Sequence, residues 1–233
     1  MPEPGIALVT GAGSGLGAVI AERLGRAGLT VAVNTRSRTG DAEAVVAAID
    51  DAGGRAFSAP ADVTDPVAVR RMFDVIAGHG KVRVLVNNAS YRPRSDFADI
   101  TEEDWHRVHA VTLDGAFLCI RNALPTLVPG GRVVNILGRN ALDGDPRRVH
   151  VSSAKYGLLG LTRALSASLR SDGVAVNAVS PGIDCEGADL VRCRDEIAEQ
   201  VALLSVEPTE VTGTMVRVDC DGSEVVSALS RSY

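Results

Sequence analysis

The sequence predicts one α/β domain, in which helices flank both faces of a doubly wound parallel sheet. Short runs rich in valine recur along the 233 residues, and each run is of strand length. Stretches with helical periodicity separate these runs, which is the βαβ alternation of a parallel sheet. Runs without polar alternation suit strands that are buried on both faces. No repeat, low-complexity block or linker divides the chain, so we expect a single domain.

Apolar runs and capping residues place the expected elements. Strands are expected at Ile6–Val9, Val31–Asn34, Arg55–Ala59, Val82–Val86, Arg132–Ile136 and Val174–Val179. Helices are expected from the first glycine-rich turn to about Ala27, at about Asp41–Ala52, from Asp65, at about Glu102–Leu127 and at Ser152–Arg170. Asp65 and Pro66 mark a helix start, because Asp caps free amides and Pro fits the first turn.

Composition and charge exclude several function classes. With a net charge of −5 and 3% aromatic residues, the chain lacks the basic and stacking surfaces that bind nucleic acids. No apolar run reaches the ~18 residues of a membrane span, and the N-terminus has no signal-peptide pattern. Four cysteines without CxxC spacing or matching histidines predict neither a metal site nor a disulfide framework. We therefore expect a cytoplasmic protein that acts on a small molecule.

A glycine-rich turn, Thr10–Gly17 (TGAGSGLG), joins the first expected strand to the first helix. Glycine allows the tight turn and a close approach of the backbone to a pyrophosphate, while the helix amides and dipole attract the anion. A bare structural turn uses the same residues. In this strand–turn–helix context, however, nucleotide binding is favoured, and the predicted sheet is Rossmann-like.

The spacing Thr-Gly-x-x-x-Gly-x-Gly resembles that of the short-chain dehydrogenase/reductase family. Four further segments are similar to family motifs in order and spacing: Asp62–Thr64, Val84–Ala89, Ser152–Leu165 and Asn177–Gly182. The likeness extends over nearly the whole chain. It implies cofactor contacts at Thr10, Gly11, Ser14, Gly15, Leu16, Gly17, Thr35, Arg36, Ser37, Asp62, Val63, Asn88, Ala89, Lys155, Pro181 and Gly182.

The residues after the second expected strand indicate which cofactor binds. An acidic residue there would bind the ribose 2′-hydroxyl of NAD(H) and repel a 2′-phosphate. This chain has Thr35-Arg36-Ser37-Arg38, and a guanidinium matches a phosphate in charge and geometry. NADP(H) is therefore favoured over NAD(H). The alternatives are that both arginines are solvated loop charges, or that no cofactor binds.

The resemblance also implies a catalytic tetrad, of which this chain keeps one member. In the family a Ser polarises the carbonyl, a Tyr protonates it, a Lys lowers the pKa of that Tyr, and an Asn holds a relay water. Lys155 is present, but the Tyr, Ser and Asn positions hold Val151, Gly138 and Thr112. A general acid contributes ~10²–10⁴-fold in rate, and an oxyanion donor a similar factor. We therefore expect an atypical active site.

Three other residues are candidates for the missing chemistry. Tyr91 and His150 are candidate replacement groups, and Arg139 is a candidate for binding an acidic substrate. The expected substrate lid, at about 183–211, is also shorter than the resemblance implies. Glu186 falls where the family often has a Thr near the pyrophosphate, and a carboxylate there would disfavour that dianionic group.

Three function classes stay open on the sequence alone. The favoured one is an atypical NADP(H)-dependent oxidoreductase of bacterial specialised metabolism, since the composition is typical of a GC-rich source. The second is a non-redox enzyme, such as a cyclase, dehydratase or isomerase, that uses the same pocket. The third is a non-catalytic scaffold or partner subunit. In all three, the resemblance implies a homodimer or homotetramer formed through the helices at about 102–127 and 152–170.

Overall fold

The computed structural model describes residues 5–37, 39–127, 130–138, 143–181, 187–207, 211–218 and 224–227, and it confirms the predicted fold class. Its centre is one eight-stranded sheet in the order β3-β2-β1-β4-β5-β6-β7-β8. All neighbouring pairs are parallel except β7 and β8. The strand order reverses between β1 and β4, and ligands of doubly wound sheets bind at such a switch point.

The strands are β1 (Ile6–Val9), β2 (Thr30–Val33), β3 (Arg55–Ser58), β4 (Val82–Asn87), β5 (Arg132–Ile136), β6 (Ala175–Pro181), β7 (Met215–Val218) and β8 (Glu224–Ser227). The main helices are α1 (Gly15–Arg26), α2 (Thr39–Asp51), α3 (Pro66–Ala77), α4 (Glu102–His109), α5 (Gly115–Ala123), α7 (Val149–Ser168) and α8 (Gly187–Val206). A π-helical segment, η2 (Ala110–Asp114), joins α4 to α5.

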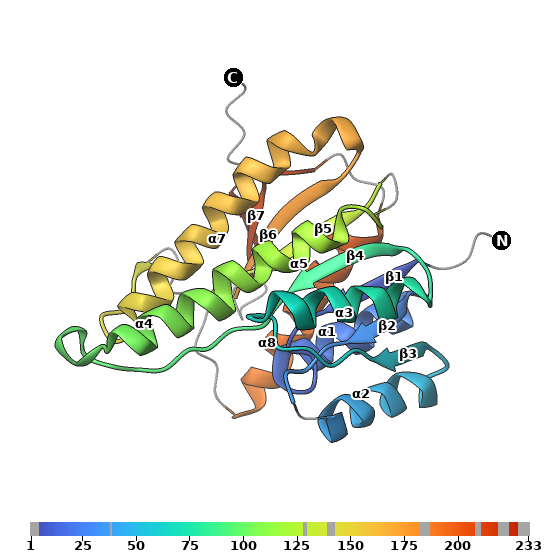
Figure 1. Cartoon of the computed structure of the whole chain (residues 1–233), viewed down its shortest axis with the longest axis horizontal. Coiled ribbons are helices and arrows are strands. Elements are labelled where there is room, and N and C mark those ends of the chain that lie inside the picture. Colours follow the sequence, from blue (N-terminus) through green and yellow to red (C-terminus); the bar gives the residue numbers. More distant parts are fainter. Residues whose placement is uncertain are drawn as a thin grey trace.

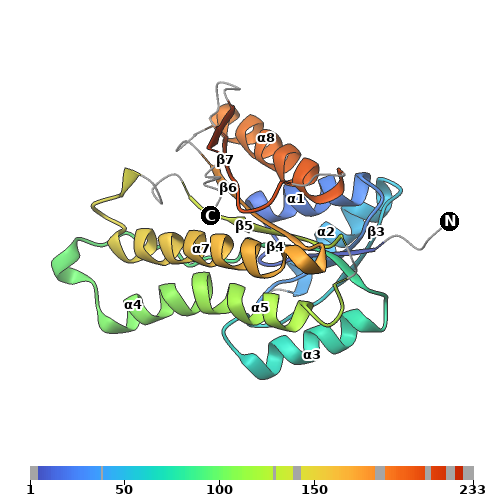
Figure 2. The ribbon, with the colours of Figure 1, turned by 90° about the horizontal axis from the view of Figure 1, so that it is seen from above.

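Helices cover both faces of the sheet (Figures 1 and 2). α1, α2 and α8 lie on one face, and α3, α4, α5 and α7 lie on the other. Each helical layer encloses its own hydrophobic core, because Ile20 and Val201 belong to one buried cluster while Phe73 and Ile120 belong to the other. Among the described residues, no helix combines the length and apolar character needed to cross a membrane.

The structure corrects several of the predicted elements. α7 begins three residues before the predicted Ser152, and the long helix predicted to Leu127 ends at Ala123 and contains η2. The segment predicted as a lid contains the helix α8, which packs on α1 through buried residues such as Ile197 and Val201. β7 and β8 were not predicted, because the charged residues Arg217 and Glu224 interrupt their short apolar runs.

Candidate active site

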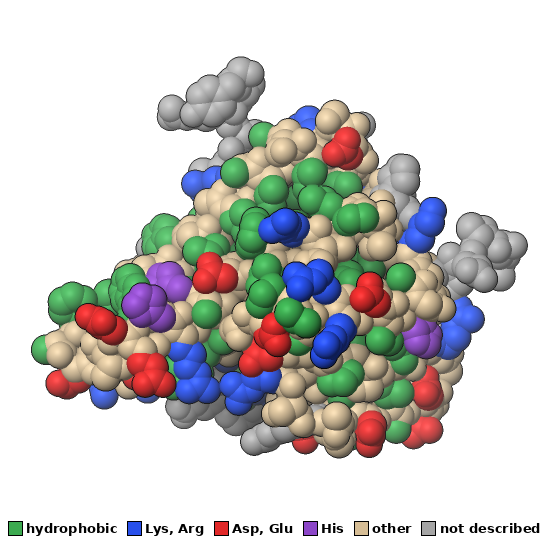
Figure 3. Space-filling view, viewed as in Figure 1, with side chains coloured by type: hydrophobic (Ala, Val, Ile, Leu, Met, Phe, Trp, Pro, Cys, Tyr) green, Lys and Arg blue, Asp and Glu red, His purple; other side chains and the backbone are tan. Residues whose placement is uncertain are grey.

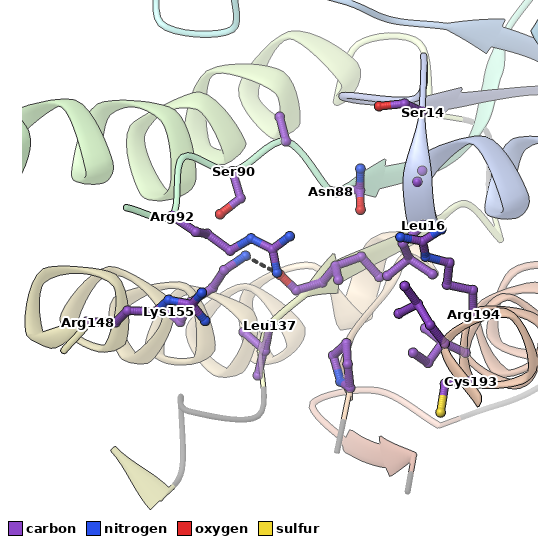
Figure 4. A pocket seen from close by; sticks show the side chains of 17 residues that line it. Ser14, Leu16, Asn88, Ser90, Arg92, Leu137, Arg148, Lys155, Cys193 and Arg194 are labelled. Carbon is purple, nitrogen blue, oxygen red and sulfur yellow. Dashed lines mark hydrogen bonds between the residues drawn. The ribbon is translucent and has the colours of Figure 1, made fainter. Parts of the chain in front are cut away.

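A cavity of about 500 Å³ lies where the carboxyl ends of the central strands meet. Its lining comes from the turn after β1, the loop after β4, the ends of β5 and β6, and the helices α7 and α8 (Figure 4). Eight of the predicted cofactor-contacting residues line it: Ser14, Gly15, Leu16, Gly17, Asn88, Ala89, Lys155 and Pro181. The structure therefore brings together segments that are far apart in the sequence.

Thr10 and Asn88 fix the glycine-rich turn between β1 and β4. The Thr10 hydroxyl oxygen accepts hydrogen bonds of 3.0 Å from the amides of both Asn88 and Ala89. The Asn88 side-chain amide donates to the carbonyl oxygens of Thr10 at 2.9 Å and Gly11 at 3.1 Å. These bonds hold the turn in one conformation, so its backbone is preorganised for a ligand.

The same turn fits a pyrophosphate. Gly11 and Gly15 have φ values of 62° and 59°, which L side chains rarely adopt. A Cβ on Gly17 would overlap the Gly11 carbonyl oxygen and lie 2.6 Å from Asn88 Nδ2. The first turn of α1 has no acidic residue. Within the described part of the chain, its N-cap Ser14 makes no side-chain capping bond. The amides and positive end of α1 therefore suit an anion.

A second cavity, of about 360 Å³, lies beside the turn on the β2 and β3 side. Its lining includes the predicted cofactor residues Gly11, Arg36, Asp62, Val63 and Ala89. Asn34 shapes this region, since its side chain accepts from the Gly11 amide at 3.3 Å and donates to the carbonyl of Ala59 at 2.9 Å. Thr35 is buried and Ser37 is exposed, and neither is among the lining residues. Arg38 lies outside the described residues.

Lys155 projects from α7 into the first cavity with only 3% of its surface exposed. Its ammonium donates a 2.6 Å hydrogen bond to the Ile136 carbonyl oxygen at the end of β5. Burial, together with the smaller effect of the nearby charge of Arg92, lowers the pKa of Lys155 to about 7. The lysine therefore exchanges its proton near neutral pH, far below the range of an exposed lysine.

The three substituted tetrad positions supply no acid, and none of them is among the described residues that line the first cavity. Val151 lies one turn before Lys155 and packs in a small apolar cluster with Val108, Ala154 and the ring of Tyr91. A Cβ on Gly138 would meet no atom within 4 Å in the described structure. Thr112 is buried in η2, and its hydroxyl lies 3.4 Å from the hydroxyl of Ser90.

The candidate replacement groups do not reach the cavity that contains Lys155. Tyr91 lines the second cavity instead, and its hydroxyl lies 3.4 Å from Asp104 Oδ1. His150 is fully buried, and burial lowers its pKa, with smaller effects from Asp104 and His109. Neither is among the residues that line the first cavity. Arg139, Gly182 and Glu186 lie outside the described residues.

Sequence reasoning missed three arginines in the first cavity: Arg92, Arg148 and Arg194. They come from the loop after β4, the N-cap of α7 and the middle of α8, and no local pattern marks them. Cys193 also lines the cavity and is disulfide-bonded, so the expectation that the cysteines form no disulfide is wrong at this residue.

Comparisons with known proteins agree with this geometry. The model of the short chain dehydrogenase family matches residues 5–187. The 3-oxoacyl-(acyl-carrier-protein) reductase FabG of Staphylococcus epidermidis is 32% identical over 228 residues, covering 95% of this chain and 93% of that protein. Landomycin C-6 ketoreductase LanV with bound NADP and rabelomycin has a TM-score of 0.85 at 30% identity, covering 94% of this chain and 95% of that one. A short chain dehydrogenase from Burkholderia cenocepacia in complex with NADP has a TM-score of 0.83 at 31% identity, covering 92% and 96%. The chain therefore belongs to the short-chain dehydrogenase family.

Proposed function

We propose that this protein is an NADP(H)-dependent oxidoreductase that reduces a carbonyl group of a small molecule, with Lys155 as the proton donor. One observation carries the proposal. Of the described side chains that line the first cavity, Lys155 is the one that titrates near neutral pH. Arginine stays protonated at all physiological pH values, Cys193 is disulfide-bonded, and the serine hydroxyls and the Asn88 amide do not titrate in this range.

The two cavities suit the two ends of NADP(H). The glycine-rich turn and the N-terminus of α1 would hold the pyrophosphate, and Arg36 would pair with the 2′-phosphate beside Asp62 and Val63. Two similar structures that contain NADP support this choice over NAD(H). When bound, NADPH supplies the hydride that reduces the carbonyl carbon.

The side chain of Lys155 performs the proton transfer in this proposal. Its ammonium has three donors, of which one is held by the Ile136 carbonyl oxygen. That bond fixes the position of Nζ and leaves two N–H groups to reach a carbonyl oxygen in the cavity. Lys155 gives its proton to this oxygen as the C=O double bond becomes a C–OH bond, and it takes a proton back from solvent.

The substituted tetrad makes this an atypical member of the family. Val151 and Gly138 offer no hydroxyl group to polarise the substrate oxygen. We therefore propose that the substrate is a carbonyl compound that reacts without a second hydrogen-bond donor to polarise its oxygen. We also propose that the enzyme acts in specialised metabolism. The ketoreductase LanV supports such a role by its similarity.

Calorimetric titration with NADPH and NADH tests the cofactor assignment. We expect micromolar binding of NADPH, and Arg36→Ala should weaken it by about 10- to 100-fold, because a charge-assisted hydrogen bond contributes ~1.5–3 kcal/mol. Binding of NADH should not change. Arg55→Ala is the matched control, since Arg55 is exposed at the amino end of β3, away from the site. If neither cofactor binds, the oxidoreductase proposal fails, and a non-redox enzyme or a scaffold replaces it.

We also propose that the subunits associate through the outer faces of α4, α5 and α7. Phe117 and Leu124, at and just after α5, and Tyr156 on α7 expose 46%, 38% and 47% of their surfaces. Figure 3 views this side of the molecule, where hydrophobic side chains gather between charged ones. A homodimer or homotetramer would bury these side chains.

A further inference from the structure

The cavity around Lys155 is strongly cationic. Four basic side chains line it, namely Arg92, Arg148, Lys155 and Arg194. None of its described lining residues is Asp or Glu, and Asp145, which pairs with Arg148, is not among them. A cavity with this charge, of about 500 Å³, attracts anions and disfavours cations.

Arg194 serves the cofactor end of the cavity. A Cβ built on Gly15 would lie 3.9 Å from the guanidinium of Arg194, so this side chain extends from α8 to the glycine-rich turn. Figure 4 draws Arg194 beside Leu16 of that turn, while Arg92, Arg148 and Lys155 lie towards the opposite end. The charge of Arg194 therefore complements a pyrophosphate on the turn, and it does not explain the other two arginines.

Arg148 has a buried donor that the described part of the chain leaves without an acceptor. Its Nε atom is buried and has no hydrogen-bond partner among the described residues. Its ion pair with Asp145 is long, at 4.0 Å between Nη1 and Oδ2. A buried guanidinium donor without a partner is unfavourable, because it has lost its water without gaining an acceptor. An anion in the cavity would supply that acceptor.

Arg92 adds a second charge at the same end. It lies close enough to Lys155 to lower the pKa of that lysine. When Lys155 is protonated, it, Arg92 and Arg148 place three positive charges at one end of the cavity; these repel one another, and a bound anion would relieve the repulsion. The same anion would keep Lys155 protonated, which is the form that donates a proton.

We propose that the carbonyl substrate of this site carries a carboxylate group, which Arg92 and Arg148 bind while the carbonyl faces Lys155. The inference rests on the proposed function, since it names the substrate class of the same site. Arginine suits this role because its planar guanidinium binds a carboxylate through two parallel hydrogen bonds. Neutral ketones of the same size are poor substrates.

Three oxo acids and their methyl esters test the proposal: pyruvate, acetoacetate and levulinate. Each ester keeps the ketone and removes the charge. With NADPH, we expect kcat/KM for at least one acid to exceed that of its ester by more than tenfold. Arg148→Gln should lower kcat/KM for that acid by about 10- to 100-fold, mainly by raising KM. It should change kcat/KM for the ester by less than twofold. Arg92→Gln should act in the same direction.

The chain offers a matched control for each variant. Arg147 is the neighbour of Arg148 but is exposed and pairs with Asp96. Arg147→Gln should therefore leave kcat/KM unchanged for both the acid and its ester. Arg94→Gln is the equivalent control for Arg92→Gln, since Arg94 is exposed and not among the cavity-lining residues. Succinate binding to the NADP⁺-loaded protein, measured by calorimetry, gives a readout without turnover and should be lost in Arg148→Gln.

The outcomes separate this inference from the proposed function. Equal turnover of acids and esters, or no succinate binding, overturns the carboxylate proposal and leaves the reductase proposal intact. Arginine variants that weaken NADPH binding without changing the preference for acids show that both arginines serve the cofactor, which also overturns it. Absence of NADPH binding to the wild-type protein is the separate result that removes the proposed function.

Discussion

Lys155→Met is expected to lower kcat/KM for NADPH-dependent carbonyl reduction by about 10²–10⁴-fold, which is the usual contribution of a general acid. Methionine keeps the length of the side chain and fits a buried position, but it has no proton to give. NADPH should still bind, because the glycine-rich turn and Arg36 are unchanged, although the cofactor contact expected of Lys155 is lost. The measurement is the rate of NADPH oxidation, with calorimetry as the check on cofactor binding.

Lys81→Met is the matched control for this variant. Lys81 is the only other lysine of the chain, and it is exposed just before β4, away from the cavity. Its replacement should leave the rate unchanged. If Lys155→Met reduces the carbonyl as fast as the wild type, the proton comes from another group, and Lys155 is not the proton donor.

Loss of folding does not explain the expected loss of activity in Lys155→Met. The pKa of Lys155 is about 7 in the folded protein, against an ordinary value of 10.5. The unfolded chain therefore binds this proton more tightly, and the buried lysine destabilises the fold fully below pH 7 and not at all above about pH 10.5. We expect Lys155→Met to raise the unfolding free energy by a few kcal/mol at pH 6, with a smaller gain as the pH rises. Chemical denaturation at several pH values measures this difference.

Restoring the family's hydroxyl groups is expected to have the second large effect. The double variant Gly138→Ser, Val151→Tyr should raise kcat/KM for a neutral ketone by about 10²-fold or more, since it adds an acid and an oxyanion donor. Space for the serine exists, because a Cβ on Gly138 meets no described atom within 4 Å. The tyrosine must displace Tyr91, which packs against Val151, so we also expect a lower Tm.

Gly138→Ser alone is the control for this variant. It adds the hydroxyl that polarises the carbonyl but no second acid, so its gain should be much smaller than that of the double variant. A double variant that folds, binds NADPH and reduces ketones no faster than the wild type would show that these positions do not face the reacting carbonyl.

The central fold was predictable because its signals are local. Most of the first six strands are short, buried apolar runs, while β3 lies at the sheet edge and is only partly buried. The structure places each of the six within two residues of its predicted bounds. The helix α8 was missed because the sequence between Pro181 and Thr212 was compared with a family lid. Its apolar positions, such as Ile197 and Val201, show their role only when they pack on α1.

The cofactor site and the catalytic site differ in how far the sequence could predict them. The glycine-rich turn and Lys155 lie in contiguous motifs, so their chemistry is visible without the fold. Arg92, Arg148 and Arg194 come from three separate segments, and only the tertiary structure brings them to one cavity. Tyr91 was a candidate because it follows the turn after β4, but packing directs its ring towards Val151 and its hydroxyl towards Asp104.

The pH dependence of kcat/KM tests most directly whether Lys155 is the proton donor. The measurement uses NADPH and the best of the six carbonyl compounds between pH 5.5 and 9. We expect a constant value below about pH 7 and a tenfold fall per pH unit above it, because only protonated Lys155 donates. A rate that stays constant up to pH 9 would contradict the assignment of Lys155, and no NADPH oxidation at any pH would contradict the proposed reductase activity itself.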